Sequence, residues 1–192
     1  MLKSLFMVGS FVFASLFSAT SSADTISVVV NAFGSGSLGQ NSFENRLFTI
    51  TGVGDIDNVR TNGSVHTLLI GFETTIEIDG FDSAQFTDTI QAVTNNNSEL
   101  GGFGNTSESV GLLFVSNEAF ETFDLRSSLR EVTGEGIPVF GVPHQTDAGA
   151  FRINSLSGLA TFSATVESVP EPCSTMLFVV VSGLCAVRRH GR

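Results

Sequence analysis

The stretch that decides the fold is Ala160–Glu167, with the sequence ATFSATVE. Apolar side chains occupy every second position, and hydroxyl or carboxylate side chains occupy the positions between them. A period of two over eight residues indicates a β-strand with one buried side and one solvent-facing side. The chain is therefore predicted to be built from β-strands.

Upstream of this stretch, other short apolar runs alternate with clusters of Gly, Asn and Ser. The clusters Gly34–Gly39, Thr61–Gly63 and Asn95–Gly104 predict turns. Ser83–Gln91 and Glu118–Arg130 fit either helical or strand spacing. The remaining runs predict strands at Thr25–Phe33, Arg46–Gly52, Val65–Phe72, Thr74–Asp79, Val110–Ser116, Thr122–Arg126, Ile137–Phe140 and Gly149–Asn154. About nine short strands predict an all-β fold, a single antiparallel β-sandwich of jelly-roll type.

This predicted domain covers residues 24–169 of the 192. It contains 18 acidic residues, five arginines and no lysine, a formal charge of −13. Such a charge repels phosphate backbones, which disfavours a nucleic-acid partner. Both cysteines, Cys173 and Cys185, lie beyond the domain, so it holds no thiol nucleophile and no disulfide.

The N-terminal segment, residues 1–23, predicts a secretory signal peptide. Lys3 supplies a positive start, Leu5–Phe17 is uncharged and mostly apolar, and Ser21-Ser22-Ala23 fits a small-x-small cleavage pattern. The apolar run rises only about 20 Å as a helix, which is short of the roughly 30 Å hydrocarbon core of a bilayer. We expect cleavage after Ala23, with Ala19 as the weaker alternative.

The C-terminal segment, residues 170–192, has three parts in order. Pro170, Glu171 and Pro172 form a stub that cannot lie inside a helix. The next fifteen residues carry no charge and predict a short hydrophobic helix. The terminal Arg188, Arg189 and Arg192 should remain on the cytoplasmic side of a membrane, which places the stub outside.

This order resembles the PEP-CTERM sorting signal of exported bacterial proteins. Pro170, Glu171 and Pro172 match the stub of that family, Met176–Val187 match its apolar helix, and the three arginines match its basic cluster, here interrupted by His190 and Gly191. The resemblance implies recognition by exosortase, a membrane peptidase-like enzyme. It also implies delivery to the cell surface or extracellular matrix of a bacterium that makes exopolysaccharide. A plain C-terminal membrane anchor is the alternative for this segment.

Within the domain, two acidic pairs are the candidates for calcium. Asp55 with Asp57, and Asp79 with Asp82, supply the carboxylate oxygens that Ca²⁺ prefers, although neither pair completes an EF-hand loop. Solvated turn residues are the alternative for both pairs. Gly34–Gly39 also has the formal GxGxxG spacing, but no helix is expected after it, so we interpret it as a glycine loop rather than a nucleotide site.

The domain carries no recognisable catalytic motif. Its histidines are His66, on the strand face shared with Leu68 and Ile70, and His144, in a predicted loop. Neither belongs to a GxSxG, HExxH or paired-histidine pattern. The domain holds thirteen Phe and no Trp or Tyr, so a stacking platform of Trp or Tyr for sugars is absent.

The sequence therefore predicts an exported, non-enzymatic protein of the cell envelope with a structural or interaction role and no required cofactor. Expected partners are the export machinery, an exosortase-like enzyme and exopolysaccharide or matrix, with the membrane contacted through the C-terminal helix before processing. A calcium-assisted carbohydrate-binding module and a secreted hydrolase are the alternatives.

Overall fold

The computed structural model describes residues 24–71, 73–106 and 110–168. The predicted signal peptide with its cleavage site at Ala23, and the predicted sorting segment with its Pro-Glu-Pro stub and terminal arginines, lie outside the described residues. Within the described part, no helix has the length and apolar character that a membrane span requires.

The described residues form strands and short 3-10 turns. The turns are η1 (Ile56–Asn58), η2 (Asn96–Ser98) and η3 (Glu118–Glu121). The strands are β1 (Thr25–Leu38), β2 (Asn41–Asp55), β3 (Val59–Asn62), β4 (Val65–Gly71), β5 (Thr74–Ile78), β6 (Ala84–Gln85), β7 (Ile90–Asn95), β8 (Leu100–Asn105), β9 (Val110–Ser116), β10 (Leu129–Pro138), β11 (His144–Thr146), β12 (Gly149–Leu156) and β13 (Leu159–Glu167).

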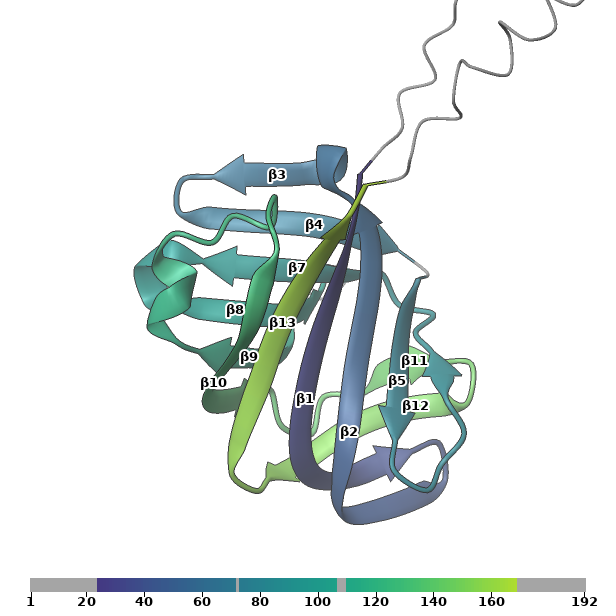
Figure 1. Ribbon diagram of the computed structural model, residues 1–192. Coiled ribbons are helices and arrows are strands. Elements are labelled where there is room, and N and C mark those ends of the chain that lie inside the picture. Colours follow the sequence, from purple (N-terminus) through teal and green to yellow (C-terminus); the bar gives the residue numbers. More distant parts are fainter. Residues whose placement is uncertain (1–23, 72, 107–109, 169–192) are drawn as a thin grey trace, which may run out of the picture. The chain divides into compact units, whose positions relative to one another are not determined.

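The strands form one continuous antiparallel sheet that curls on itself (Figure 1). Its order is β3-β4-β7-β8-β9-β10-β13-β1-β2-β5-β6. The all-β, antiparallel prediction is thus confirmed. The two ends of the body lie side by side, because Thr25 at the start of β1 pairs with Glu167 at the end of β13.

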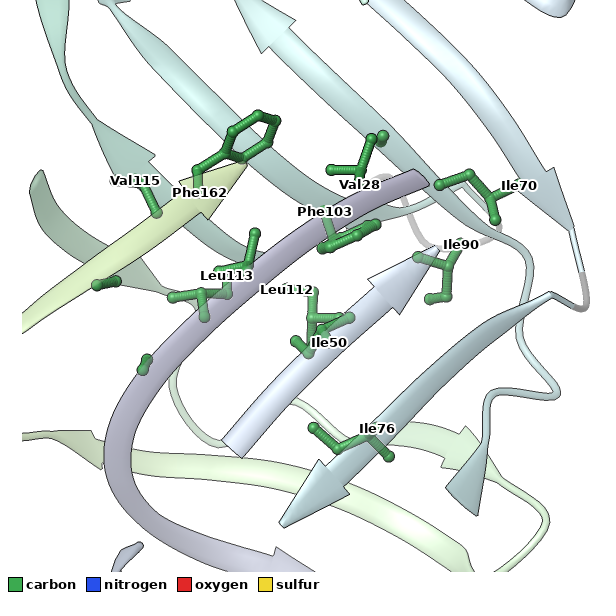
Figure 2. Packing of buried hydrophobic residues seen from close by; sticks show 14 of the residues in the cluster. Val28, Ile50, Ile70, Ile76, Ile90, Phe103, Leu112, Leu113, Val115 and Phe162 are labelled. Atoms are coloured by element: carbon green, nitrogen blue, oxygen red, sulfur yellow. The ribbon is translucent and has the colours of Figure 1, made fainter. Parts of the chain in front are cut away.

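The core lies between the two halves of the curled sheet. Side chains from β1, β2, β5 and β13 point toward those from β4, β7, β8 and β9 (Figure 2). Ile70 of β4 and Phe103 of β8 occupy the space that a side chain at Gly52 on β2 would need. Every second residue of β1 from Ile26 to Leu38 is buried, as the period of two requires.

A second part of the core is enclosed by a ring of hydrogen-bonded strands. The second half of β1 leaves β13 and pairs with β12 from Gly34 to Leu38, with a register shift between Ser35 and Gly36. From β12 the ring continues through β11, an isolated bridge between Thr146 and Phe86, then β6, β5 and β2 back to β1. Inside it, the aromatic rings pack edge to face or stacked with centroids 5.8–6.3 Å apart: Phe43, Phe48, Phe81, Phe86 and Phe151.

Several predicted elements differ from the structure. Gly34–Gly39 was expected to be a turn, but β1 continues through Leu38 and only Gly39 and Gln40 turn. The predicted turn Asn95–Gly104 contains most of strand β8. The predicted strand Thr122–Arg126 is irregular, and Phe123 and Leu125 are buried there without strand pairing. The continuation of β1 is set by β12, which is distant in sequence, whereas β8 pairs with its sequence neighbours β7 and β9.

Candidate functional site

One side of the sheet carries three rows of outward-facing side chains across β13, β1 and β2. Their alternate neighbours along each strand are buried, so these residues face solvent. We call this surface the outer face, and it consists of Leu159, Thr161 and Ser163 on β13, Val29, Asn31 and Phe33 on β1, and Leu47, Thr49 and Thr51 on β2.

The first row is apolar. Phe33 lies opposite Leu47. Leu159 lies two residues from Thr161, where the pairing of β13 with β1 ends, and the Phe33 carbonyl accepts the Ser157 amide at 2.8 Å. Leu159 is 63% exposed, Phe33 48% and Leu47 37%. Single exposed apolar residues are common on protein surfaces, whereas Phe33 and Leu47 form an exposed pair, with Leu159 exposed on the same face of β13.

The second row is polar and internally ordered. The Thr49 hydroxyl donates to Asn31 Oδ1 at 2.8 Å, and Asn31 Nδ2 donates to Thr161 Oγ1 at 3.1 Å. The Thr161 hydroxyl in turn donates to a carboxylate oxygen of Glu131 on β10 at 3.4 Å. All three bonds run in one direction across four strands, which fixes the rotamer of each side chain before any ligand arrives.

At the β2 side, the outer face descends into a hollow of about 320 Å³ that Leu47 and Thr49 line together with Glu77, Asp79 and Ser83. A wider hollow of about 730 Å³ shares Gly80 and Phe81 with it. Its other lining residues come from the β1–β2 turn and from the segment after β5: Gln40, Asn41, Ser42 and Asp82. Both volumes lie in the range of ligand-binding clefts.

Acidic residues border the outer face at both ends of its rows. Glu135 on β10 pairs with Leu159, and Glu77 on β5 pairs with Thr49. The Asp79 amide donates to the Leu47 carbonyl at 2.9 Å, which extends the apolar row to a second carboxylate. Arg46 is a cation beside the hollow, with Nη1 3.8 Å from the position that a Gly80 Cβ would take. The nine side chains of the outer face are themselves uncharged.

The structure separates the four calcium candidates into two pairs. Asp55 Oδ1 accepts the Asp57 amide at 2.8 Å and thereby caps η1. Asp79 and Asp82 flank Gly80 beside the two hollows. Asp79 is bonded to Leu47, eight residues before Asp55 on β2, so the pairs lie about 26 Å apart along the strand. Among the described residues, no three His, Cys, Asp or Glu side chains come together as a metal site.

His66 lies half-buried on β4 in a defined hydrogen-bond chain. Asn96 Nδ2 donates to the carbonyls of Phe120 and Phe123, so Asn96 Oδ1 accepts from His66 Nε2 at 2.7 Å. His66 Nδ1 is then left to accept the Thr61 hydroxyl at 3.0 Å. The Thr61 hydroxyl is thus oriented toward the acceptor nitrogen of an imidazole. The same chain of hydrogen bonds connects the β3–β4 hairpin to η2 and η3.

His144 differs from its prediction. The sequence placed it in a loop, but it begins strand β11 and is buried beside the phenylalanine-lined ring, opposite Phe151. His144 joins the sheet because it pairs with Phe151 of β12. Pro143 lies just before the strand and does not prevent this pairing.

The outer face was not predicted as a site. Alternation alone places Thr161 and Ser163 outward, but it cannot tell which strands lie beside β13. The signal that was available is the series of Thr, Ser and Asn at outward positions of the predicted strands at 25–33, 46–52 and 160–167. Comparison with family models, curated proteins and solved structures returned no match for this chain.

Proposed function

We propose that this chain is an exported protein of the cell surface or extracellular matrix, sorted through its C-terminal segment, with an interaction role for its body. One structural observation supports the proposal beyond the sequence: Thr25 and Glu167 are paired neighbours. Chain segments that precede Asp24 and follow Ser168 therefore join the body at the same end. An attachment at that end leaves the outer face and the hollows available for an external partner.

The opposed halves of the curled sheet support the finer expectation of a β-sandwich or jelly-roll-like module. Partners of the proposed function are the export machinery, an exosortase-like enzyme and a matrix component such as exopolysaccharide. Nucleic acid is disfavoured by the −13 charge of residues 24–169. We propose a binding role rather than an enzymatic one.

The proposal is tested by following maturation of the full chain in a bacterium that contains an exosortase-like enzyme. One variant replaces Arg188, Arg189 and Arg192 with Gln, and another replaces Pro170, Glu171 and Pro172 with Ala. A matched control replaces three body arginines, Arg46, Arg60 and Arg130, with Gln. The N-terminal sequence and the intact mass of the protein from each strain are measured.

We expect wild type and control to begin at Asp24 and to lack the C-terminal segment. The arginine variant should stall or insert in the wrong orientation, because these charges hold that end in the cytoplasm. The alanine variant should insert into the membrane but remain uncut. A C-terminal segment that is retained on mature wild type as well would reduce it to a simple anchor, and cleavage of both tail variants like wild type would contradict recognition through the stub and the arginines. An intact Met1 on envelope protein would overturn export.

A further inference from the structure

We infer that the outer face binds an extended, uncharged polysaccharide chain that lies across strands β13, β1 and β2. This inference deepens the proposed function and rests on it only for the biological setting, because the binding itself is testable on purified protein. Four observations carry it: the apolar row, the polar row, the distribution of charge and the hollow at one end.

The apolar row offers what one side of a sugar ring requires. Pyranose rings present C–H groups on their faces, and these pack against exposed aromatic and aliphatic side chains. Phe33 and Leu47 stand side by side on neighbouring strands, and Leu159 is exposed on the same face of β13, with 37–63% of each residue exposed. The separation of neighbouring strands, about 4.8 Å, is close to the repeat of rings in an extended glycan.

The polar row can form hydrogen bonds with the hydroxyl groups at the edge of the same sugar ring. It lies two residues along each strand from the apolar row, roughly 6.7 Å away. Thr49 has already donated its hydroxyl hydrogen to Asn31, so only its lone pairs remain for a ligand. The Thr161 hydroxyl points toward Glu131 at the longer distance of 3.4 Å and already accepts from Asn31. Asn31 retains one N–H, so the row presents mostly acceptors, and a ligand rich in hydroxyl hydrogens complements it.

The charge distribution around the outer face favours an uncharged polysaccharide as the ligand. No outer-face side chain is ionisable, and both rows reach carboxylates at each end: Glu131 and Glu135 on β10, and Glu77 on β5 with Asp79 directly after it. These ends lie roughly 19 Å apart across four strand intervals. An anionic glycan meets two carboxylates at each end, with Arg46 as the one described cation beside the hollow at the β5 end. A polymer with one cation per repeat would have to place charges over the uncharged centre, where they lose hydration without a partner.

The hollow at the β2 side extends the surface along which the bound polysaccharide can continue. Leu47 and Thr49 belong both to the outer face and to the hollow of about 320 Å³, and the wider hollow follows past Gly80 and Phe81. Amide and hydroxyl groups of Gln40, Asn41 and Ser42 line this continuation. A second copy of this chain fits less well, because two bodies of charge −13 repel each other and the apolar row spans only three side chains.

The test is affinity electrophoresis of the full chain, kept soluble in a detergent without a sugar headgroup. Native gels are cast with laminarin, barley β-glucan, galactomannan or anionic alginate, with calcium or with chelator. Binding to polylysine is measured in parallel by fluorescence anisotropy at low and high salt. The variants are Phe33→Ser, Leu159→Ser and Asn31→Ala, and the matched control is Phe140→Ser, whose side chain is 56% exposed elsewhere.

We expect retardation by at least one uncharged polysaccharide, unchanged by chelator and by salt. Phe33→Ser and Leu159→Ser should weaken it at least tenfold and Asn31→Ala severalfold, whereas Phe140→Ser should stay within twofold of wild type. Melting temperatures of the variants establish that they fold, and Leu159→Ser serves alone if Phe33→Ser does not.

Three outcomes would overturn the inference: no uncharged polysaccharide binds, alginate or polylysine alone binds, or Phe140→Ser weakens binding as much as the outer-face variants. None of these outcomes touches export, which the maturation experiment decides separately. Failure of maturation with intact binding would in turn remove the proposed setting and leave the binding surface in place.

Discussion

Gly36 is a position where one methyl group decides whether two strands can meet. A Cβ there would overlap the carbonyl oxygen of Arg152 on β12 and press on the Phe43 ring. Gly36→Ala should therefore destabilise the protein by about 1–3 kcal/mol, as overpacking does. Urea unfolding measures the change, and Ser37→Ala, one residue along the same strand, should stay within about 0.5 kcal/mol of wild type. Equal midpoints for both variants would show that β12 moves away at little cost.

The same residue explains why the sequence predicted a turn at Gly34–Gly39. Gly34, Gly36 and Leu38 face the interior and alternate with Ser35 and Ser37, so the period of two is present. Glycine contributes nothing to an apolar count, and the backbone that requires its small size lies more than a hundred residues away. Close approach between strands cannot be predicted from local composition.

Asn96 joins three segments through one side chain. Replacement by Ala leaves the Phe120 and Phe123 carbonyls and the His66 ring without this partner. Because unsatisfied half-buried polar groups each destabilise by about 1–3 kcal/mol, Asn96→Ala should lower the free energy of unfolding by at least that amount. The control is Asn97→Ala, since Asn97 is exposed and its backbone amide makes the local bond. A thermal or urea midpoint equal to that of Asn97→Ala would contradict the role assigned to Asn96.

Among the elements, the β11–β12 hairpin joins the rest of the sheet through the pairing of β12 with β1 and, on the β11 side, also through Asp88. Its carboxylate accepts the Gln145 amide of β11 at 2.7 Å and the Asn105 side chain of β8 at 3.1 Å. Loss of two charge-assisted bonds, each worth about 1.5–3 kcal/mol, should let the hairpin open more often.

In Asp88→Ala, hydrogen exchange of peptides covering 144–151 should accelerate at least about tenfold, while β1 and β13 change little. The control is Asp124→Ala, because Asp124 accepts the Arg126 amide, two residues away, at 3.0 Å. Equal acceleration in every strand would mean that the ring opens only with global unfolding.

Element by element, the sequence predicted the strands that alternate with apolar residues and missed those built from glycine. The runs within β1, β2, β5 and β13 are confirmed, because Val, Ile and Phe mark their buried sides. Strand β8 has the sequence LGGFGN, in which Gly101 is covered by the Phe120 ring and Gly102 by the Leu113 carbonyl. The outer face could not be predicted from the sequence for a related reason. Each of its rows combines three strands that only the tertiary register brings together.

At the scale of the whole molecule, we expect a monomeric, acidic body with little dependence on calcium. The candidate pairs Asp55 with Asp57 and Asp79 with Asp82 lie far apart and each offers two carboxylates. An ion bound only to the native state raises stability by mass action, so weak binding shifts the melting temperature little. We expect a shift below about 2 °C between millimolar calcium and chelator.

The measurement is differential scanning calorimetry of the full chain, with Asp79→Asn and Asp55→Asn as variants. A large, saturable rise in melting temperature that one variant abolishes would assign calcium to that pair. It would also favour the calcium-assisted binding module over a metal-independent surface.

The pairing of Thr25 with Glu167 has a mechanical consequence for a body held by its C-terminal end. A pull applied after Glu167 runs along β13, which is bonded to β1 on one side and to β10 on the other. Because antiparallel hydrogen bonds lie perpendicular to the strands, they share this load in shear and do not break one after another as in peeling. Tension between an anchored tail and a polymer on the outer face would thus cross the middle of the sheet, and the edge strands would carry almost none of it.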